Sequence, residues 1–388
     1  MQFKEIVGQQ AVKQQLIRSA REGRVSHAQL FVGPAGNGAL PLAIAYAQYL
    51  SCEEPGETDS CGVCATCKKY QKLAHPDLHF SYPFIAPKKE TVALEYISQW
   101  RDAILEQPYL TLEKWMDRLD AENKQPNINI AECHSIISKL SLKPFESGFK
   151  VLIMWLPEYL REVGNSLLKL IEEPSSSTLF LLVSEQPDLL LPTLRSRTQL
   201  VRTERLEEEE VAAYLLEAGL ADQQGAAQAA KLCGGNLAAA LELAAGETSN
   251  FGELFRDWMR ICYQNDGVKM VEWTEQVGGK GSGSKSGIGR ENQKNLLRYG
   301  LSVLRQSLLQ QAQLPVQARG EELDFITRFA AQLNPEKIAA ISGELEEAIY
   351  HIERNANPRI LFLDVSLQIA RYLKIGGAIV RPGRVVMT

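Results

Sequence analysis

The sequence contains no long apolar run, no targeting pattern and no excess of basic residues. Its longest apolar runs, 151–156 and 179–183, fall far short of the ~20 residues that a membrane-spanning helix needs, so we expect no contact with a membrane. The N-terminus lacks the basic and then apolar order of a cleaved signal peptide, which favours a cytoplasmic protein. With 42 basic and 47 acidic residues the net charge is −5, which argues against a protein that mainly coats nucleic acid.

What is present indicates a globular chain of two or three domains. It has 388 residues, of which 45% are hydrophobic and 23% are charged. Over residues 1–203, amphipathic helices alternate with short apolar strands, which predicts an α/β domain with a parallel sheet. Residues 83–126 do not fit that alternation, so we interpret them as an insertion. The rest is almost wholly helical, and we divide it into a small domain, 204–248, and a bundle, 249–388. The predicted strands are 28–32, 79–82, 150–156 and 178–184.

A glycine-rich loop follows the first predicted strand and precedes a helix. Its glycines, Gly33, Gly36 and Gly38, include the Gly-x4-Gly spacing of a phosphate-binding loop, in which backbone N–H groups and a helix N-terminus face the phosphates. Nucleotide chemistry there also needs a Lys that reaches the phosphates and a Ser or Thr that ligates Mg²⁺. Those two positions hold Ala39 and Leu40, so the sequence predicts the backbone of a nucleotide site without its reactive side chains.

A second loss lies at the end of the predicted strand 150–156. An active site would hold an acidic pair there, for the metal ion and the attacking water. This strand ends with Trp155 and Leu156 instead. Two independent losses favour a silent nucleotide pocket that binds no ATP, with a divergent active ATPase and a plain glycine-rich turn as the alternatives.

Four of the seven cysteines fall within residues 52–67, and the other three are isolated in predicted helices. Two overlapping Cys-x2-Cys steps and a fourth cysteine from the preceding helix suit tetrahedral zinc, and four thiolates leave no open position for catalysis. We therefore predict a structural zinc site, with a redox pair, a disulfide and an iron–sulfur cluster as alternatives. The acidic stretch 53–59 argues against a zinc module that binds nucleic acid. The predicted ligands are Cys52, Cys61, Cys64 and Cys67.

Two arginines, Arg195 and Arg197, stand on a short polar element just before the first domain ends. Side chains placed there can reach a phosphate on a neighbouring subunit, as arginine fingers do. They can also form a solvated or salt-bridged surface pair. The residues alone favour this second interpretation.

Several segments together resemble one family, the clamp-loader subunits of bacterial DNA polymerase III within the AAA+ superfamily. They occur in the order of that family and span most of residues 1–202. The resemblance implies an AAA+ core with a zinc module at about 51–70, a helical lid at 204–248, and a collar at 249–388 that holds a hetero-pentamer together. The segments that carry it are Phe3-Lys-Glu-Ile-Val-Gly-Gln-Gln, Ser26-His-Ala-Gln-Leu-Phe-Val-Gly-Pro-Ala-Gly-Asn-Gly38, the four-cysteine cluster, His75-Pro-Asp77, Asn165-Ser-Leu-Leu-Lys-Leu-Ile-Glu-Glu-Pro174 and Leu191-Pro-Thr-Leu-Arg-Ser-Arg197.

The resemblance also implies roles for single residues. ATPase subunits of the family keep an intact phosphate loop, whereas its delta' members usually lack ATPase function, and this chain resembles the delta' type. The family's Ser-Arg-Cys motif, whose arginine acts in trans on a neighbour's ATP, matches Ser196, Arg197 and Thr198, with Thr in place of Cys. A second-sensor arginine is expected where this chain has Ala238, which is a third departure from an active ATPase.

What the resemblance implies is a scaffolding subunit that is not catalytic by itself. Its expected partners are the gamma/tau ATPase subunits and delta in a hetero-pentamer, and its expected cofactor is structural zinc. The sliding clamp and primed DNA are expected to be contacted mostly through the complex, during DNA replication. An active ATPase subunit of the gamma/tau type and a zinc-dependent nucleic-acid-binding module stay as alternative functions.

Overall fold

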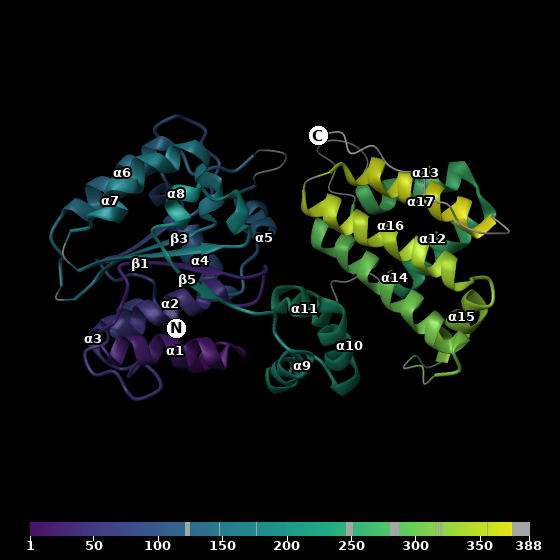
Figure 1. Cartoon of the computed structure of the whole chain (residues 1–388), viewed down its shortest axis with the longest axis horizontal. Helices are drawn as coiled ribbons and strands as arrows, with labels where there is room; N and C mark the ends of the chain where they lie inside the picture. The colour runs from purple at the N-terminus through teal and green to yellow at the C-terminus, as the bar shows by residue number, and fades with distance from the viewer. Residues whose placement is uncertain are drawn as a thin grey trace. The chain divides into compact units, whose positions relative to one another are not determined.

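The computed structural model describes the chain except for residues 121–124, 147, 176, 246–250, 280–286, 315, 317, 319, 355 and 375–388. The chain divides into two compact units, Met1–Ala244 and Ala245–Thr388. Figure 1 shows an α/β first unit and a helical second unit. The three-domain division, with boundaries near 203 and 248, stays a prediction.

A five-stranded sheet forms the centre of the first unit, in the order β2-β3-β4-β1-β5. All four neighbouring pairs are parallel, which confirms the predicted α/β class. The sequence analysis misses β5 because only Val201 of its four residues is buried, so it has no apolar run. The strands are β1 (Ala28–Val32), β2 (Leu78–Ser81), β3 (Lys150–Trp155), β4 (Thr178–Ser184) and β5 (Gln199–Arg202).

Both faces of this sheet are covered by helices. Val151 and Ile153 of β3 belong to one core cluster, which residues of α2 complete. Leu152 and Met154 point to the other face and pack with residues of α6 and η3. Burial on both faces is the usual state of a parallel sheet with helical crossovers. The helices of this part are η1 (Phe3–Glu5), α1 (Gln10–Arg21), α2 (Ala39–Ser51), α3 (Ala65–Gln71), α6 (Ile130–Ser141), η3 (Pro157–Leu167), α7 (Leu168–Glu172), η4 (Pro187–Leu189) and α8 (Pro192–Arg195).

The predicted insertion, 83–126, is helical in parts and packs into the first core cluster. Trp100 and Trp115 are fully buried, and the Trp100 ring stacks on Tyr82 with centroids 4.0 Å apart. An antiparallel bridge between Phe84 and Asn127 closes its base. The insertion therefore completes the core beside the sheet. Its elements are η2 (Ala93–Tyr96), α4 (Ile97–Glu106) and α5 (Leu112–Arg118).

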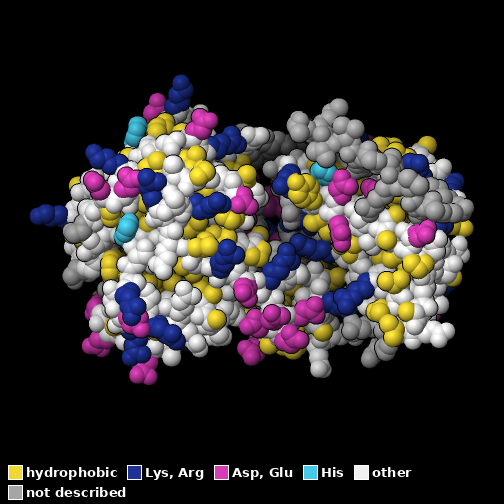
Figure 2. Space-filling view, in the orientation of Figure 1, with side chains coloured by type: hydrophobic (Ala, Val, Ile, Leu, Met, Phe, Trp, Pro, Cys, Tyr) yellow, Lys and Arg dark blue, Asp and Glu magenta, His cyan; other side chains and the backbone are white. Residues whose placement is uncertain are grey.

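Three short helices with a core of their own follow the sheet within the first unit. Asp222 caps the second of them, and Gly234 and Gly235 end it with left-handed φ angles of 58° and 80°. Figure 2 shows acidic side chains gathered over α9, whose first turn is acidic and so complements the helix dipole. The helices are α9 (Glu208–Glu217), α10 (Gln223–Cys233) and α11 (Leu237–Ala244).

The described part of the second unit is helical, as predicted for residues 249–388. Its core includes Trp258 and Trp273, whose rings stack with centroids 4.7 Å apart, and both pack edge-on against Phe362. Among the described residues of the whole chain, no helix is long and apolar enough to cross a membrane. The helices are α12 (Phe251–Gln264), α13 (Gly267–Gly278), α14 (Arg290–Gln311), α15 (Gly320–Ala330), α16 (Pro335–Glu353) and α17 (Pro358–Lys374).

Candidate metal centre and phosphate loop

The four clustered cysteines meet at the C-terminal end of α2. Cys52 ends that helix and Cys64 caps the start of α3. The Sγ atoms of these two residues and of Cys61 and Cys67 all lie within 4.8 Å of one another. Sulfurs at the corners of a tetrahedron ~2.3 Å from a zinc ion are about 3.8 Å apart, and the Sγ atoms of Cys61 and Cys67 are 3.9 Å apart. The cluster could hold one metal ion and is consistent with zinc.

Backbone N–H groups point at three of the sulfurs. The N–H of Cys61 donates to Cys52 Sγ at 3.3 Å, that of Cys64 donates to Cys61 Sγ at 3.4 Å, and that of Cys67 donates to Cys64 Sγ at 3.3 Å. Backbone donors at Val63 and Cys64 lower the pKa of Cys61 to about 7, which favours the thiolate that binds metal. Burial raises the pKa of Cys67, and a bound cation would offset that cost.

The loop between the cysteines also holds the N-terminus of the chain. The Asp59 carboxylate accepts the N–H groups of Phe3 and Lys4, both at 3.0 Å. The Gln2 side-chain amide donates to the carbonyl of Ser60 at 2.6 Å. A metal that orders this loop would therefore also order the N-terminal segment of the chain.

The phosphate loop has the backbone that its spacing predicts, but the side chain of Asn37, in the loop itself, binds the start of α2. Gly36 and Gly38 both adopt left-handed φ angles, 69° and 95°, and α2 begins at the next residue, Ala39. The N–H of Ala39 donates to Asn37 Oδ1 at 3.1 Å. The Asn37 amide in turn donates to Thr203 Oγ1 at 2.8 Å. An N–H group that faces phosphate in a working loop is thus already hydrogen-bonded within the chain.

Two side chains from distant segments pack against the loop. Asn236 Oδ1 lies 1.8 Å from the position that a Cβ on Gly36 would take, so only glycine fits there. The Tyr109 ring lies 3.1 Å from the corresponding position on Gly38. Both side chains are buried. The glycines of the loop therefore serve close packing against protein side chains.

The end of β3 carries Trp155 and Leu156 where an acidic pair would stand in an active site. Trp155 is buried and packs against Trp100 of the insertion, with ring centroids 5.3 Å apart. Leu156 is buried and has a left-handed φ of 53°. The next acidic residue, Glu158, accepts two backbone N–H groups after β4 through one carboxylate oxygen, and its other oxygen has no hydrogen-bond partner among the described residues. Burial raises the pKa of Glu158, so this carboxyl anchors backbone and favours the neutral form.

Arg197 lies at the surface, one residue beyond Ser196, which ends α8. Its guanidinium pairs with the carboxylate of Glu172 at the end of α7. It also donates to the carbonyl of Thr193 at 2.9 Å and to Ser196 Oγ at 3.4 Å. Thr198 donates from its hydroxyl to the carbonyl of Arg195 at 3.1 Å, and so supports the turn that carries Arg197. The arginine is therefore exposed yet held in one direction.

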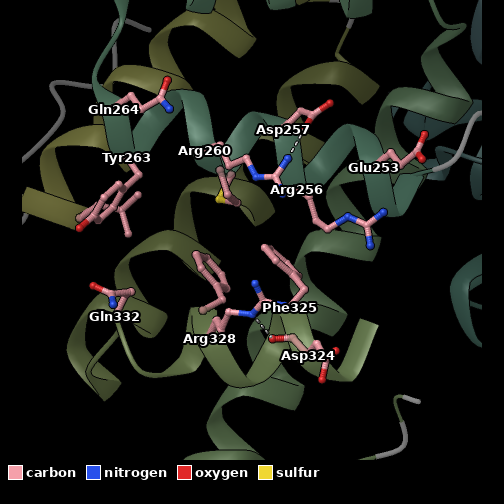
Figure 3. Close-up of a pocket in the computed structure, with 13 residues that line it drawn as sticks. Glu253, Arg256, Asp257, Arg260, Tyr263, Gln264, Asp324, Phe325, Arg328 and Gln332 are labelled. Atoms are coloured by element: carbon pink, nitrogen blue, oxygen red, sulfur yellow. Dashed lines mark hydrogen bonds and ion pairs between the residues drawn. The ribbon is translucent and has the colours of Figure 1, made fainter. Parts of the chain in front are cut away.

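A separate pocket of about 740 Å³ lies in the second unit between α12 and α15 (Figure 3). Three arginines and three acidic residues line it, so its formal charges cancel. Its other lining residues include aromatic rings and a methionine. Arginine, methionine and aromatic residues are enriched at protein interfaces, whereas a phosphate site would carry a positive excess. The charged, aromatic and methionine side chains that line the pocket are Glu253, Arg256, Asp257, Met259, Arg260, Tyr263, Asp324, Phe325, Arg328 and Phe329.

The sequence predicts the cysteines, the loop and Arg197 as site residues, but it gives no sign of three residues that contact the loop or Arg197 in the structure. Tyr109 and Asn236 contact the loop from segments that are distant in sequence, and Glu172 pairs with Arg197 from α7. No spacing in the sequence marks any of the three. Asn37 could have been found, since an Asn side chain commonly accepts a hydrogen bond from the backbone N–H two residues on, as it does here from Ala39.

Comparisons with known proteins give matches to subunits of DNA polymerase III. A model of the family described as DNA polymerase III, delta subunit, matches residues 8–207. The chain is 25% identical over 367 residues to DNA polymerase III subunit delta' of Escherichia coli, and the match covers 94% of each chain.

Two other relatives match over about half of this chain. It is 29% identical over 187 residues to subunit delta' of Pseudomonas aeruginosa, which is 47% of this chain and 45% of that protein. It is 26% identical over 197 residues to subunit gamma/tau of Mycobacterium bovis, which is 50% of this chain and 27% of that protein. The chain thus spans less than half of the Pseudomonas relative that it matches.

Proposed function

Because the chain belongs to the DNA polymerase III delta subunit family, we propose that it is a clamp-loader subunit that hydrolyses no ATP itself. Its named relatives include delta' subunits. It assembles with gamma/tau and delta subunits into a hetero-pentamer. Through that complex it supports loading of the sliding clamp on primed DNA. Residues 249–388, which lie in the second unit, are its collar, and zinc in the four-cysteine cluster is its structural cofactor.

The observation that carries this proposal is the contrast between the phosphate loop and Arg197. The loop supplies no Lys or hydroxyl, and Asn37 binds the N–H of Ala39 within the chain. Arg197 is exposed on a supported turn, where its guanidinium can exchange Glu172 for a phosphate on a neighbouring subunit. A subunit built in this way can contribute to a partner's ATP site without having one of its own.

The role of Arg197 is tested by ATP hydrolysis in the assembled complex. Arg197→Ala should leave the complex intact on size exclusion, because the side chain is at the surface. It should slow hydrolysis at the neighbouring site that it serves by about 10³-fold or more, the usual worth of an arginine finger. The total rate of ATP hydrolysis, measured with clamp and primed DNA, should fall by at least the fraction that this neighbouring site contributes.

Arg195→Ala is the matched control. Arg195 stands two residues away, is exposed, and pairs with Asp188 at 3.1 Å. Its removal should leave hydrolysis at the wild-type rate. A complex with Arg197→Ala that assembles and hydrolyses ATP as fast as wild type would refute the arginine finger.

A further inference from the structure

The insertion 83–126 touches the core, the phosphate loop and the three helices α9–α11, and Tyr109 makes the central contact. This residue lies between α4 and α5 and is 4% exposed. Its hydroxyl accepts the N–H of Val7 at 2.8 Å, and its ring packs beside Gly38. The same side chain belongs to the core cluster of α9–α11, together with residues such as Leu206 and Val211. One buried ring thus joins three parts of the first unit.

A second contact runs from the insertion to α11. Lys114 of α5 pairs with Glu242 at 3.2 Å, and the Glu242 side chain is only 14% exposed. A partly buried pair of this kind is screened less by solvent than a surface pair. It lies five residues beyond Tyr109, so two neighbouring points of the insertion contact the same small helical group.

The insertion is itself fixed to the sheet. Trp115 Nε1 donates to the carbonyl of Pro83 at 2.7 Å, which ties α5 to the start of the insertion. Trp100 packs between Tyr82 and Trp155, at the end of the neighbouring strands β2 and β3. A contact made by Tyr109 or Lys114 is therefore a contact with the rigid core.

We propose that the insertion is an internal tie that takes the position of a ligand beside the phosphate loop and holds α9–α11 on the core. In a phosphate-loop protein, a ligand bound between the loop and an adjacent helical group can set the position of that group. Here Tyr109 supplies buried area and a hydrogen bond beside Gly38, and Asn236 packs against Gly36 of the same loop. The helical group keeps one position whether or not a nucleotide is present.

Hydrogen–deuterium exchange of the full chain tests this tie. Tyr109→Ala removes the ring and its hydrogen bond, and should speed exchange of the amides in 206–244 by about tenfold or more. Tyr109→Phe keeps the ring and loses only the hydroxyl, so it should speed exchange much less. Added Mg-ATP should not change exchange in the wild-type chain.

Tyr96→Ala is the matched control, because Tyr96 lies in the same insertion and donates to the carbonyl of Ile85 instead. It should leave exchange in 206–244 at the wild-type rate. The tie is refuted if Tyr109→Ala and wild type exchange equally there, or if Tyr96→Ala speeds exchange as much.

The ion pair supplies a second test that does not open the core. Lys114→Glu should speed exchange in α11 by a few-fold, since it places like charges together, and the double reversal Lys114→Glu with Glu242→Lys should restore it. No effect from the single reversal would remove this pair from the tie. These measurements use neither a partner nor ATP hydrolysis, so their outcome is independent of the role proposed for Arg197.

Discussion

The four-cysteine cluster and the phosphate loop lie at the two ends of one helix, α2. They differ in whether the side chains that their spacing calls for are present. At the C-terminal end, Cys52 and its three partners keep both the spacing and the ligand atoms of a metal site. At the N-terminal end, the loop keeps the spacing and the backbone of a phosphate site, but Ala39 and Leu40 replace its reactive residues. Spacing therefore predicts backbone shape, and the side chains decide whether the chemistry is still present.

The difference extends to the space around each motif. The cysteine sulfurs face one another across a gap that suits a single ion. The loop instead contacts Asn236 and Tyr109, and its own Asn37 accepts a hydrogen bond from the N–H of Ala39. The cysteine sulfurs could hold a metal ion, whereas the loop is contacted by side chains of the same chain.

The largest effect is expected from removing one of the four predicted zinc ligands. Cys67→Ser should abolish stoichiometric zinc in the purified protein, because a buried serine hydroxyl is a poor ligand. The loop between Cys52 and Cys61, which contains Asp59, should then release the N-terminal segment. The melting temperature of the first unit should fall by roughly 10 °C. Elemental analysis and thermal unfolding measure the two effects.

Cys133→Ser is the control for this substitution. Cys133 is buried on α6 and lies outside the cluster. It should keep the wild-type zinc content whatever it does to stability. Iron in freshly purified wild-type protein, or no metal at all, would contradict the structural zinc site.

A smaller effect is expected at Glu158, the first acidic residue after β3 in the sequence. Burial raises the pKa of Glu158, so the folded chain holds a proton at a pH where the unfolded chain has released it. Stability therefore falls as the pH rises from about 4.3, the ordinary Glu value, through the folded pKa. Glu158→Gln should remove this fall and leave the chain more stable than wild type at pH 7.

Urea unfolding between pH 4 and pH 8 measures this difference. Glu162→Gln, an exposed neighbour on η3, controls for the loss of one acidic residue. If the Glu158→Gln and wild-type stability curves stay parallel across this range, the buried carboxyl does not titrate as proposed.

Much of the fold could be predicted from the sequence because its signals are local. The strand 178–184 is a continuous apolar run, and the structure has this strand with the predicted bounds. The strand β5 was missed because an edge strand with one buried residue has no such signal. The roles of Tyr109 and Glu172 were missed for another reason. They depend on which distant segments meet in the folded chain, and no pattern along the sequence records this.

The most direct test of the central claim is a calorimetric titration of the isolated wild-type chain with Mg-ATP, alongside the Ala39→Lys, Leu40→Thr double substitution. If the chain fills its own loop, neither protein binds, since restoring two side chains leaves Asn37 and Tyr109 in place. The double substitution should also lower the stability of the chain, because both positions are buried. Micromolar binding of Mg-ATP by the wild-type chain would contradict the account.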